Sequence, residues 1–256
     1  MTGVGIDIGS KYVKAAVISG DKNGFGDCLI HRNVEYAVDT ALKQAYKSAS
    51  CGALSLKKFC VTGDEYYKKR HYTMKSKAQC IAEYFHGIDS GEILVIDAGN
   101  MFIDAMVISH KGKILESGRN DRCFAGCGRF IEIICQALRI SFADIDFHYH
   151  RSDNPYSISS GCIVFAESEV VTQVNSGVPI EDIIAGIIHL VAGKISTMYE
   201  RYFSASTKAV YITGGVSSIK SINLAFKDFT NVTPLEFSVP PQYVSAYGAA
   251  LLSLKG

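Results

Sequence analysis

Two cysteines stand directly before stretches with the apolar spacing of amphipathic helices. Cys123 lies in a polar, glycine-rich turn before the helical pattern at 128–138, and Cys162 follows the polar run 157–161 before a second pattern at 164–174. A helix N-terminus favours anionic groups and lowers the pKa of a thiol, which promotes the metal-binding thiolate. This placement favours a metal centre at Cys123 and Cys162 over the alternative that both are buried core thiols.

Two cysteines supply only half of the ligands of a four-cysteine iron–sulfur cluster. A twofold homodimer would bring the same two thiols from the partner, so we expect a [4Fe-4S] cluster shared across a dimer. Cys127, about one turn beyond Cys123, is a further candidate ligand. The remaining cysteines lie on or beside apolar periodic faces and are predicted to be core residues: Cys28, Cys51, Cys60, Cys80 and Cys135.

A repeated hairpin predicts a second kind of chemistry. The stretch 4–18 (VGIDIGSKYVKAAVI) matches 94–108 (LVIDAGNMFIDAMVI) at one constant offset. A glycine in such a turn lets the backbone approach a phosphate, and a carboxylate just before it can hold Mg²⁺ through water. A single D-x-G hairpin is usually an ordinary β-turn, but its repetition favours the phosphate interpretation. The residues expected to face ATP or ADP and Mg²⁺ are Asp7, Gly9, Ser10 and Lys11 in the first copy and Asp97, Gly99 and Asn100 in the second.

The repeat predicts an α/β fold with two duplicated halves and a nucleotide cleft between them. Each copy is expected to continue with a third strand (28–34; 113–117) and a helix (38–49; 128–138). The first half would span 1–92 together with the C-terminal helix at about 243–256, and the second half would span 93–242 with the cluster cysteines.

A strand at 209–213 ends in Gly214-Gly215, and a helix follows from about residue 217. A glycine pair at such a junction lets an adenosine approach the backbone, although a tight turn explains it equally well. The polar stretch 143–157 is expected to be irregular. Glu167 and Glu169 are expected to lie in a first helical turn, where acids offset the helix dipole.

Composition excludes some classes of partner. The chain of 256 residues has 26 Lys and Arg against 25 Asp and Glu, a net charge of +1. This charge gives no overall electrostatic field that would favour binding to nucleic acid or to a membrane. Eight cysteines with no visible signal peptide indicate a reducing cytoplasm and metal or redox use rather than disulfides.

Together these motifs resemble the ATP-dependent activators of 2-hydroxyacyl-CoA dehydratases and the related benzoyl-CoA reductase ATPase subunits. Both belong to the actin-like ATPase superfamily, whose halves are ribonuclease H-like. The resemblance covers nearly the whole chain: GIDIGS (5–10), NDRCFAGCGRF (120–130), CIVFAESEV (162–170), EDIIAGI (181–187), ITGGV (212–216) and QYVSAYGAAL (242–251). The resemblance implies that Cys123 and Cys162 are the cluster ligands and that Gly214 and Gly215 face the adenosine.

The resemblance further implies an iron–sulfur ATPase that passes single electrons at low potential. Ferredoxin or flavodoxin would be the electron donor, and the acceptor would be a dehydratase, an aromatic-ring reductase or a double-cubane iron–sulfur protein. The sequence departs from the family where the second hairpin has Met101 and Phe102 in place of a polar Gln and Asp, which predicts slow hydrolysis.

Two alternatives stay open. One is a small-molecule kinase of the same superfamily without a cluster, for which Asp104 would be the nearby candidate base. The other is a nucleotide-responsive assembly protein with a weak or inactive ATP site, which the changes in the second hairpin permit.

Overall fold

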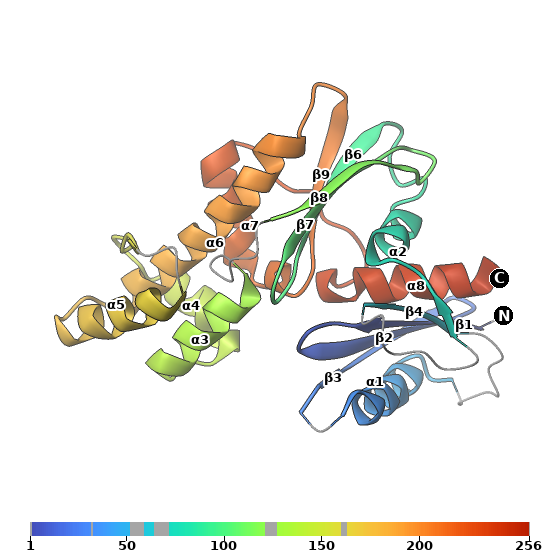
Figure 1. The fold of residues 1–256 in the computed structure, drawn as a ribbon, viewed down its shortest axis with the longest axis horizontal. Helices are drawn as coiled ribbons and strands as arrows, with labels where there is room; N and C mark the ends of the chain where they lie inside the picture. The colour runs from blue at the N-terminus through green and yellow to red at the C-terminus, as the bar shows by residue number, and fades with distance from the viewer. Residues whose placement is uncertain are drawn as a thin grey trace. The chain divides into compact units, whose positions relative to one another are not determined.

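The computed structural model describes residues 2–31, 33–51, 59–63, 72–120, 127–159 and 163–255, and at 163 and 164 the backbone alone. The chain divides into two compact units (Figure 1). Unit 1 comprises Met1–Glu92, Ile108–Leu115 and Phe237–Gly256, and unit 2 comprises Ile93–Val107 and Glu116–Glu236. The C-terminal helix therefore belongs with the N-terminal strands.

A five-stranded sheet with the order β3-β2-β1-β4-β5 forms the centre of unit 1. The first three strands form an antiparallel meander, and the last two run parallel to β1 and to each other. The strands are β1 (Thr2–Ile8), β2 (Tyr12–Ser19), β3 (Lys22–Leu29), β4 (Phe59–Gly63) and β5 (Tyr72–Met74).

Helices cover both faces of this sheet. Successive side chains of β1 point to opposite sides of the sheet, and a helix packs on each side. Val4 and Ile6 share a buried core with α1 (Val34–Ser48), and α8 (Val244–Lys255) lies on the other face (Figure 1). Small residues on α8, including Ala246 and Ala250, permit this close packing. Helix α2 (Lys77–Tyr84) packs beside α8 and begins with a capping box formed by Ser76 and Gln79.

The third strand of unit 1 differs from its predicted place. It occupies Lys22–Leu29 rather than 28–34, because β2 turns back at Gly20, which adopts a positive φ of 59°, and β3 pairs with β2 along its whole length. Helix α1 accordingly starts at Val34, four residues earlier than predicted. Asn33 caps it by accepting a hydrogen bond from the Tyr36 N–H at 2.7 Å.

Unit 2 has a four-stranded sheet with the order β8-β7-β6-β9. One buried core joins this sheet to the helices of the unit. The elements are β6 (Glu92–Ala98), β7 (Ile103–Ile108), β8 (Ile114–Arg119), α3 (Gly128–Leu138), α4 (Ile145–Tyr149), α5 (Ile163–Asn175), α6 (Ile180–Tyr202), β9 (Thr207–Thr213) and α7 (Lys220–Thr230).

Two predictions about unit 2 need correction. The stretch 143–157 is not wholly irregular: Ser141 accepts from the Ala143 N–H and caps a 3₁₀ turn that leads into α4. The helix expected from residue 217 begins as a 3₁₀ turn at Val216–Ser218, and α7 itself starts at Lys220. Its first amides donate to the Asp146 carboxylate on α4.

No helix in the described part of the chain is both long and apolar enough to cross a bilayer.

Candidate functional site

Each unit carries one of the two repeated hairpins in the same local geometry. The Gly9 N–H donates to the Tyr12 carbonyl at 3.0 Å, and the Gly99 N–H donates to the Phe102 carbonyl at 2.9 Å. These donor–acceptor pairs lie ninety positions apart, which is the offset of the sequence repeat. The hairpin tips are thus duplicated in structure as well as in sequence.

Asp7 is a buried carboxylate in a basic setting. Its Oδ2 lies 3.6 Å from the Lys14 Nζ and accepts from the Ser245 hydroxyl of α8 at 2.7 Å. Burial raises the pKa of Asp7, but the positive charges of Lys77 and Lys14, with the Ser245 hydrogen bond, outweigh it and hold the pKa below its ordinary value. Within the described residues, its buried Oδ1 has no hydrogen-bond donor. An orphaned carboxylate oxygen beside a glycine turn fits a hydrated Mg²⁺.

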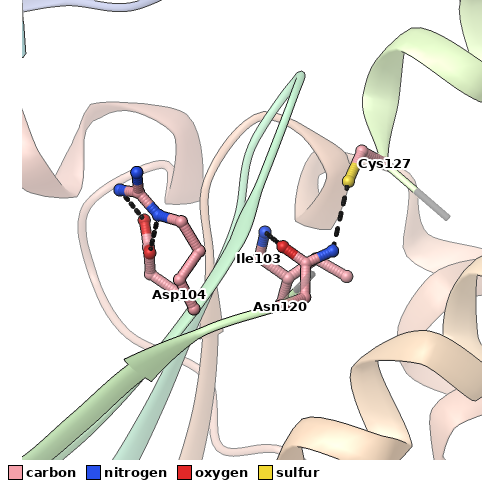
Figure 2. A network of polar contacts seen from close by, with 5 residues as sticks. Ile103, Asp104, Asn120 and Cys127 are labelled. Carbon is pink, nitrogen blue, oxygen red and sulfur yellow. Dashed lines mark hydrogen bonds and ion pairs between the residues drawn. The ribbon is translucent and has the colours of Figure 1, made fainter. Parts of the chain in front are cut away.

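Asp97 occupies the same place in unit 2 with different partners. It is buried and accepts from the Thr213 hydroxyl of β9 at 3.1 Å. The counterpart of Lys14 is Asp104. Its Oδ1 accepts a hydrogen bond from the Nε of Arg119 at 2.6 Å, and its Oδ2 accepts one from the Nη2 at 3.1 Å (Figure 2). Arg119 also lies over the Phe102 ring at 4.5 Å. The first hairpin is therefore lined by lysines and the second by acids, one of which is neutralised by arginine.

A Thr-Gly turn accompanies each hairpin, a correspondence that sequence reasoning missed. Gly63 has φ +100°, and a Cβ there would lie 2.0 Å from the Ile8 carbonyl oxygen. Gly214 has φ +91°, and its Cβ would lie 2.3 Å from the Ala98 carbonyl oxygen. Both positions therefore require glycine for backbone reasons. A Cβ at Gly215, in contrast, would meet no described atom within 4 Å, so this is the glycine with room beside it.

The polar residues at the hairpin tips are accessible. Ser10 is exposed and Lys11 is half-buried, with its Nζ 5.3 Å from the centre of the Tyr12 ring. Asn100 is half-buried, and its carbonyl accepts the Arg129 N–H at 2.8 Å. The second hairpin is thus bonded directly to the start of α3.

The two predicted cluster ligands, Cys123 and Cys162, lie outside the described residues. Helices α3 and α5, which follow them in the chain, pack against each other. Cys127 is fully buried and accepts a hydrogen bond from Asn120 Nδ2 at 3.8 Å. Of the other cysteines, 60, 80 and 135 are buried as predicted, whereas 28 and 51 are only half-buried. No group of three His, Cys, Asp or Glu side chains with metal-site geometry occurs among the described residues.

The first three amides of α3 donate hydrogen bonds to carbonyl groups of the protein. The Gly128 N–H donates to the Gly99 carbonyl at 3.0 Å, and the Phe130 N–H donates to the Cys127 carbonyl at 3.0 Å. With the bond from Arg129 to the Asn100 carbonyl, the first three amides of the helix are satisfied within the protein. The helix dipole can still act on a nearby anion, but these N–H groups are engaged elsewhere.

Glu169 also has a role other than the predicted one. Helix α5 begins at Ile163, so neither Glu167 nor Glu169 lies in its first turn. The Glu169 carboxylate accepts from the Tyr156 hydroxyl at 3.1 Å, from the Ser159 N–H at 2.9 Å and from the Ser159 hydroxyl at 2.9 Å. It therefore ties the segment just before Cys162 to the helix just after it.

Residues 4–253 match the BadF/BadG/BcrA/BcrD ATPase family, which spans nearly the whole chain. The chain belongs to this family. The "2-hydroxyisocaproyl-CoA dehydratase activator" of Clostridioides difficile is 30% identical over 97% of this chain and 93% of the relative.

Solved structures agree with the family assignment. The Clostridium difficile activator of 2-hydroxyisocaproyl-CoA dehydratase with bound ADPNP has a TM-score of 0.88 at 28% identity and covers 100% of this chain and 95% of that chain. Component A of the Acidaminococcus fermentans (R)-2-hydroxyglutaryl-CoA dehydratase has a TM-score of 0.86 at 27% identity, with 100% and 98% coverage. The prediction of an actin-like ATPase fold built from two α/β halves is confirmed.

Proposed function

We propose that this family member is an ATP-dependent iron–sulfur protein that delivers single electrons at low potential to a partner enzyme. The observation that carries the proposal is the pair of D-x-G hairpins with their Thr-Gly turns, duplicated in backbone geometry, in a chain of an ATPase family. A solved relative with 28% identity and a TM-score of 0.88 holds ADPNP, which supports adenine nucleotide binding here.

The first hairpin has the charge expected of a phosphate site. Lys14 and Lys11 lie at or near the turn, and the Gly9 backbone can approach an oxyanion closely. Asp7, with its buried and unpartnered Oδ1, would hold Mg²⁺ through water. Asp97 would play the corresponding role in the second hairpin, held in place by the Thr213 hydroxyl.

Cys123 and Cys162 would hold a [4Fe-4S] cluster shared with the same residues of a second copy. The flanking elements fit such a group, because α5 begins at the residue after Cys162, α3 begins five residues after Cys123, and the two helices pack together. When bound, the cluster would supply one-electron redox chemistry. The electron donor would be ferredoxin or flavodoxin, and the acceptor an iron–sulfur dehydratase or reductase.

The kinase alternative loses its candidate base. Asp104 would have to accept a proton from a substrate hydroxyl, but its carboxylate is bound by two nitrogens of Arg119 at 2.6 and 3.1 Å. Both oxygens of the Asp104 carboxylate therefore already accept hydrogen bonds from the guanidinium. The assembly-protein alternative remains an outcome of the following experiment.

The test is an anaerobic purification followed by iron and labile-sulfide analysis and by Mg²⁺-dependent release of phosphate from ATP. We expect about two iron atoms per chain, because one four-iron cluster would serve two chains, together with measurable but slow hydrolysis. Protein without iron that converts ATP to ADP only with a small-molecule acceptor, and transfers the phosphoryl group to that acceptor instead of releasing phosphate, would support a kinase. Protein that binds nucleotide but has neither iron nor turnover would support an assembly role.

A further inference from the structure

Asn120, the first residue after β8, bonds to two separate places through one side chain. Its Oδ1 accepts from the Ile103 N–H at 2.9 Å, and its Nδ2 lies 3.8 Å from the Sγ of Cys127 (Figure 2). Its backbone N–H also donates to the Ile103 carbonyl at 2.9 Å. Ile103 is the first residue of β7, directly after the second hairpin turn. Asn120 thus joins that hairpin to the residue before α3.

Asn120 and Cys127 are the two residues that flank 121–126, the stretch that includes Cys123. Both ends of this stretch are therefore tied to the second hairpin. At one end the bonds run from Asn120 to Ile103. At the other, the Gly128 and Arg129 amides donate to the Gly99 and Asn100 carbonyls. A displacement of the hairpin turn must either move both ends together or break these hydrogen bonds.

Unit 1 provides an internal comparison, because it contains the other copy of the repeat. Strand β3 ends at Leu29 and α1 begins at Val34, so the junction is 30–33, whereas the junction in unit 2 is 120–127. The counterpart of Asn120 is Ile30, whose N–H donates to the Lys11 carbonyl at 2.8 Å but whose side chain cannot form hydrogen bonds. The copy of the repeat that carries Cys123 thus has both the longer junction and the side-chain hydrogen bonds of Asn120.

We propose that Asn120 is a positioning residue that transmits the nucleotide state of the second hairpin to the segment bearing Cys123. The proposal rests on the proposed function, in which Asp97 and Gly99 respond to the phosphates and Mg²⁺. It also assigns a role to Cys127. This thiol is the acceptor at the base of the segment and part of the core, so the proposal gives it a role other than that of a cluster ligand.

The test compares Asn120→Asp with the wild type as full-length, anaerobically purified protein. Asp retains an oxygen that accepts from Ile103 but replaces the Nδ2 donor that reaches Cys127. Hydrogen–deuterium exchange of the peptide spanning 120–130 is measured with Mg-ADP and with Mg-ADPNP. In the wild type we expect the exchange rates to differ by about fivefold or more, the lower range of allosteric coupling, and in Asn120→Asp by less than about twofold.

Two further variants make the result specific. Cys127→Ala removes the same hydrogen bond from its other side and should reduce the nucleotide difference equally; it carries the test if Asn120→Asp does not fold. Asn33→Ala removes an asparagine side chain at the corresponding junction of unit 1, where it caps α1, and should leave the difference at 120–130 unchanged. Persistence of the difference in both unit 2 variants, or its loss in Asn33→Ala, would overturn the proposal.

Failure of the proposed function gives a different result. Iron and sulfide are measured on the same samples. Absence of iron from the wild type argues against the cluster, while a nucleotide-dependent exchange that Asn120→Asp abolishes still supports the coupling. Iron with no nucleotide-dependent exchange in the wild type supports the cluster and refutes the coupling.

Discussion

At the scale of single residues, the two repeated aspartates have diverged in their surroundings. Asp7 lies beside Lys14, and Asp97 accepts a hydroxyl hydrogen bond from Thr213. At the position of Lys14, unit 2 has Asp104, which binds Arg119. A duplicated backbone thus holds two different charge patterns, with an Asp–Lys pair at the first hairpin and an Asp–Arg pair at the second.

Replacing Asp7 by Asn should change the response of stability to acid. Because the folded pKa of Asp7 is lowered, its ionised form stabilises the protein above the unfolded pKa of about 3.9, and this contribution is lost as pH falls through the folded pKa. Asp7→Asn should cost about 1–3 kcal/mol at pH 7, because it leaves Lys14 without its ion-pair partner, and should flatten the loss of stability below about pH 4.

Urea unfolding at pH 7 and at pH 3 measures both effects, and nucleotide binding should weaken in the same variant. Asp21→Asn, which removes an exposed carboxylate from the turn between β2 and β3, is the matched control and should change stability by less than about 0.5 kcal/mol. An equal acid response in the two variants would contradict the role given to Asp7.

At the scale of elements, the turn after β9 separates two glycines that look alike in the sequence. Gly214 is held at positive φ against the end of β6, whereas Gly215 has φ −66° and open space at its Cβ position. Only at Gly215 does the backbone conformation not require glycine. Gly215 is therefore the position at which loss of glycine should report on a ligand rather than on folding.

We expect Gly214→Ala to destabilise the protein by about 1–3 kcal/mol or more, because it combines an unfavourable φ with a clash against the Ala98 carbonyl. Gly215→Ala should fold with nearly unchanged stability and, if the adenosine lies against this turn, should bind ADP at least about tenfold more weakly, a difference of about 1.4 kcal/mol.

Thermal unfolding and calorimetric titration with Mg-ADP distinguish the two variants. Unchanged ADP affinity in a folded Gly215→Ala protein would remove this glycine from the proposed nucleotide site. Wild-type stability in Gly214→Ala would contradict the backbone explanation.

At the scale of the whole molecule, the proposed cluster needs two chains. Cys123→Ala and Cys162→Ala should each reduce bound iron to near zero, because twofold symmetry turns one substitution into the loss of two of the four ligands. Cys127→Ala should retain iron, since the Cys127 thiol is fully buried and accepts a hydrogen bond from Asn120.

Iron analysis under anaerobic conditions, with light scattering for mass, measures both quantities. The iron-containing wild type should have the mass of a dimer, and chelation of the iron should shift it toward the monomer. A complete cluster in each monomer, or undiminished iron in Cys162→Ala, would refute sharing.

The sequence alone determined the features that depend on local chemistry. The D-x-G hairpins, the apolar period of α3 and the strand before Gly214 were all predicted with correct bounds or nearly so, because turn residues and periodicity act over a few neighbouring positions. The duplication was also visible, since a constant offset in the sequence requires no knowledge of contacts.

Only the tertiary structure decided the roles that depend on distant partners. Strand β3 was misplaced because its bounds follow from pairing with β2, and Glu169 was misassigned because its partners lie ten or more positions earlier in the chain. In the sequence, Asn120 was only part of the motif 120–130, which leads into the helical pattern at 128–138. The hydrogen bonds of Asn120 and of the start of α3 to the second hairpin form only when β7, β8 and α3 pack together, because buried amides and carbonyls must find partners wherever the fold places them.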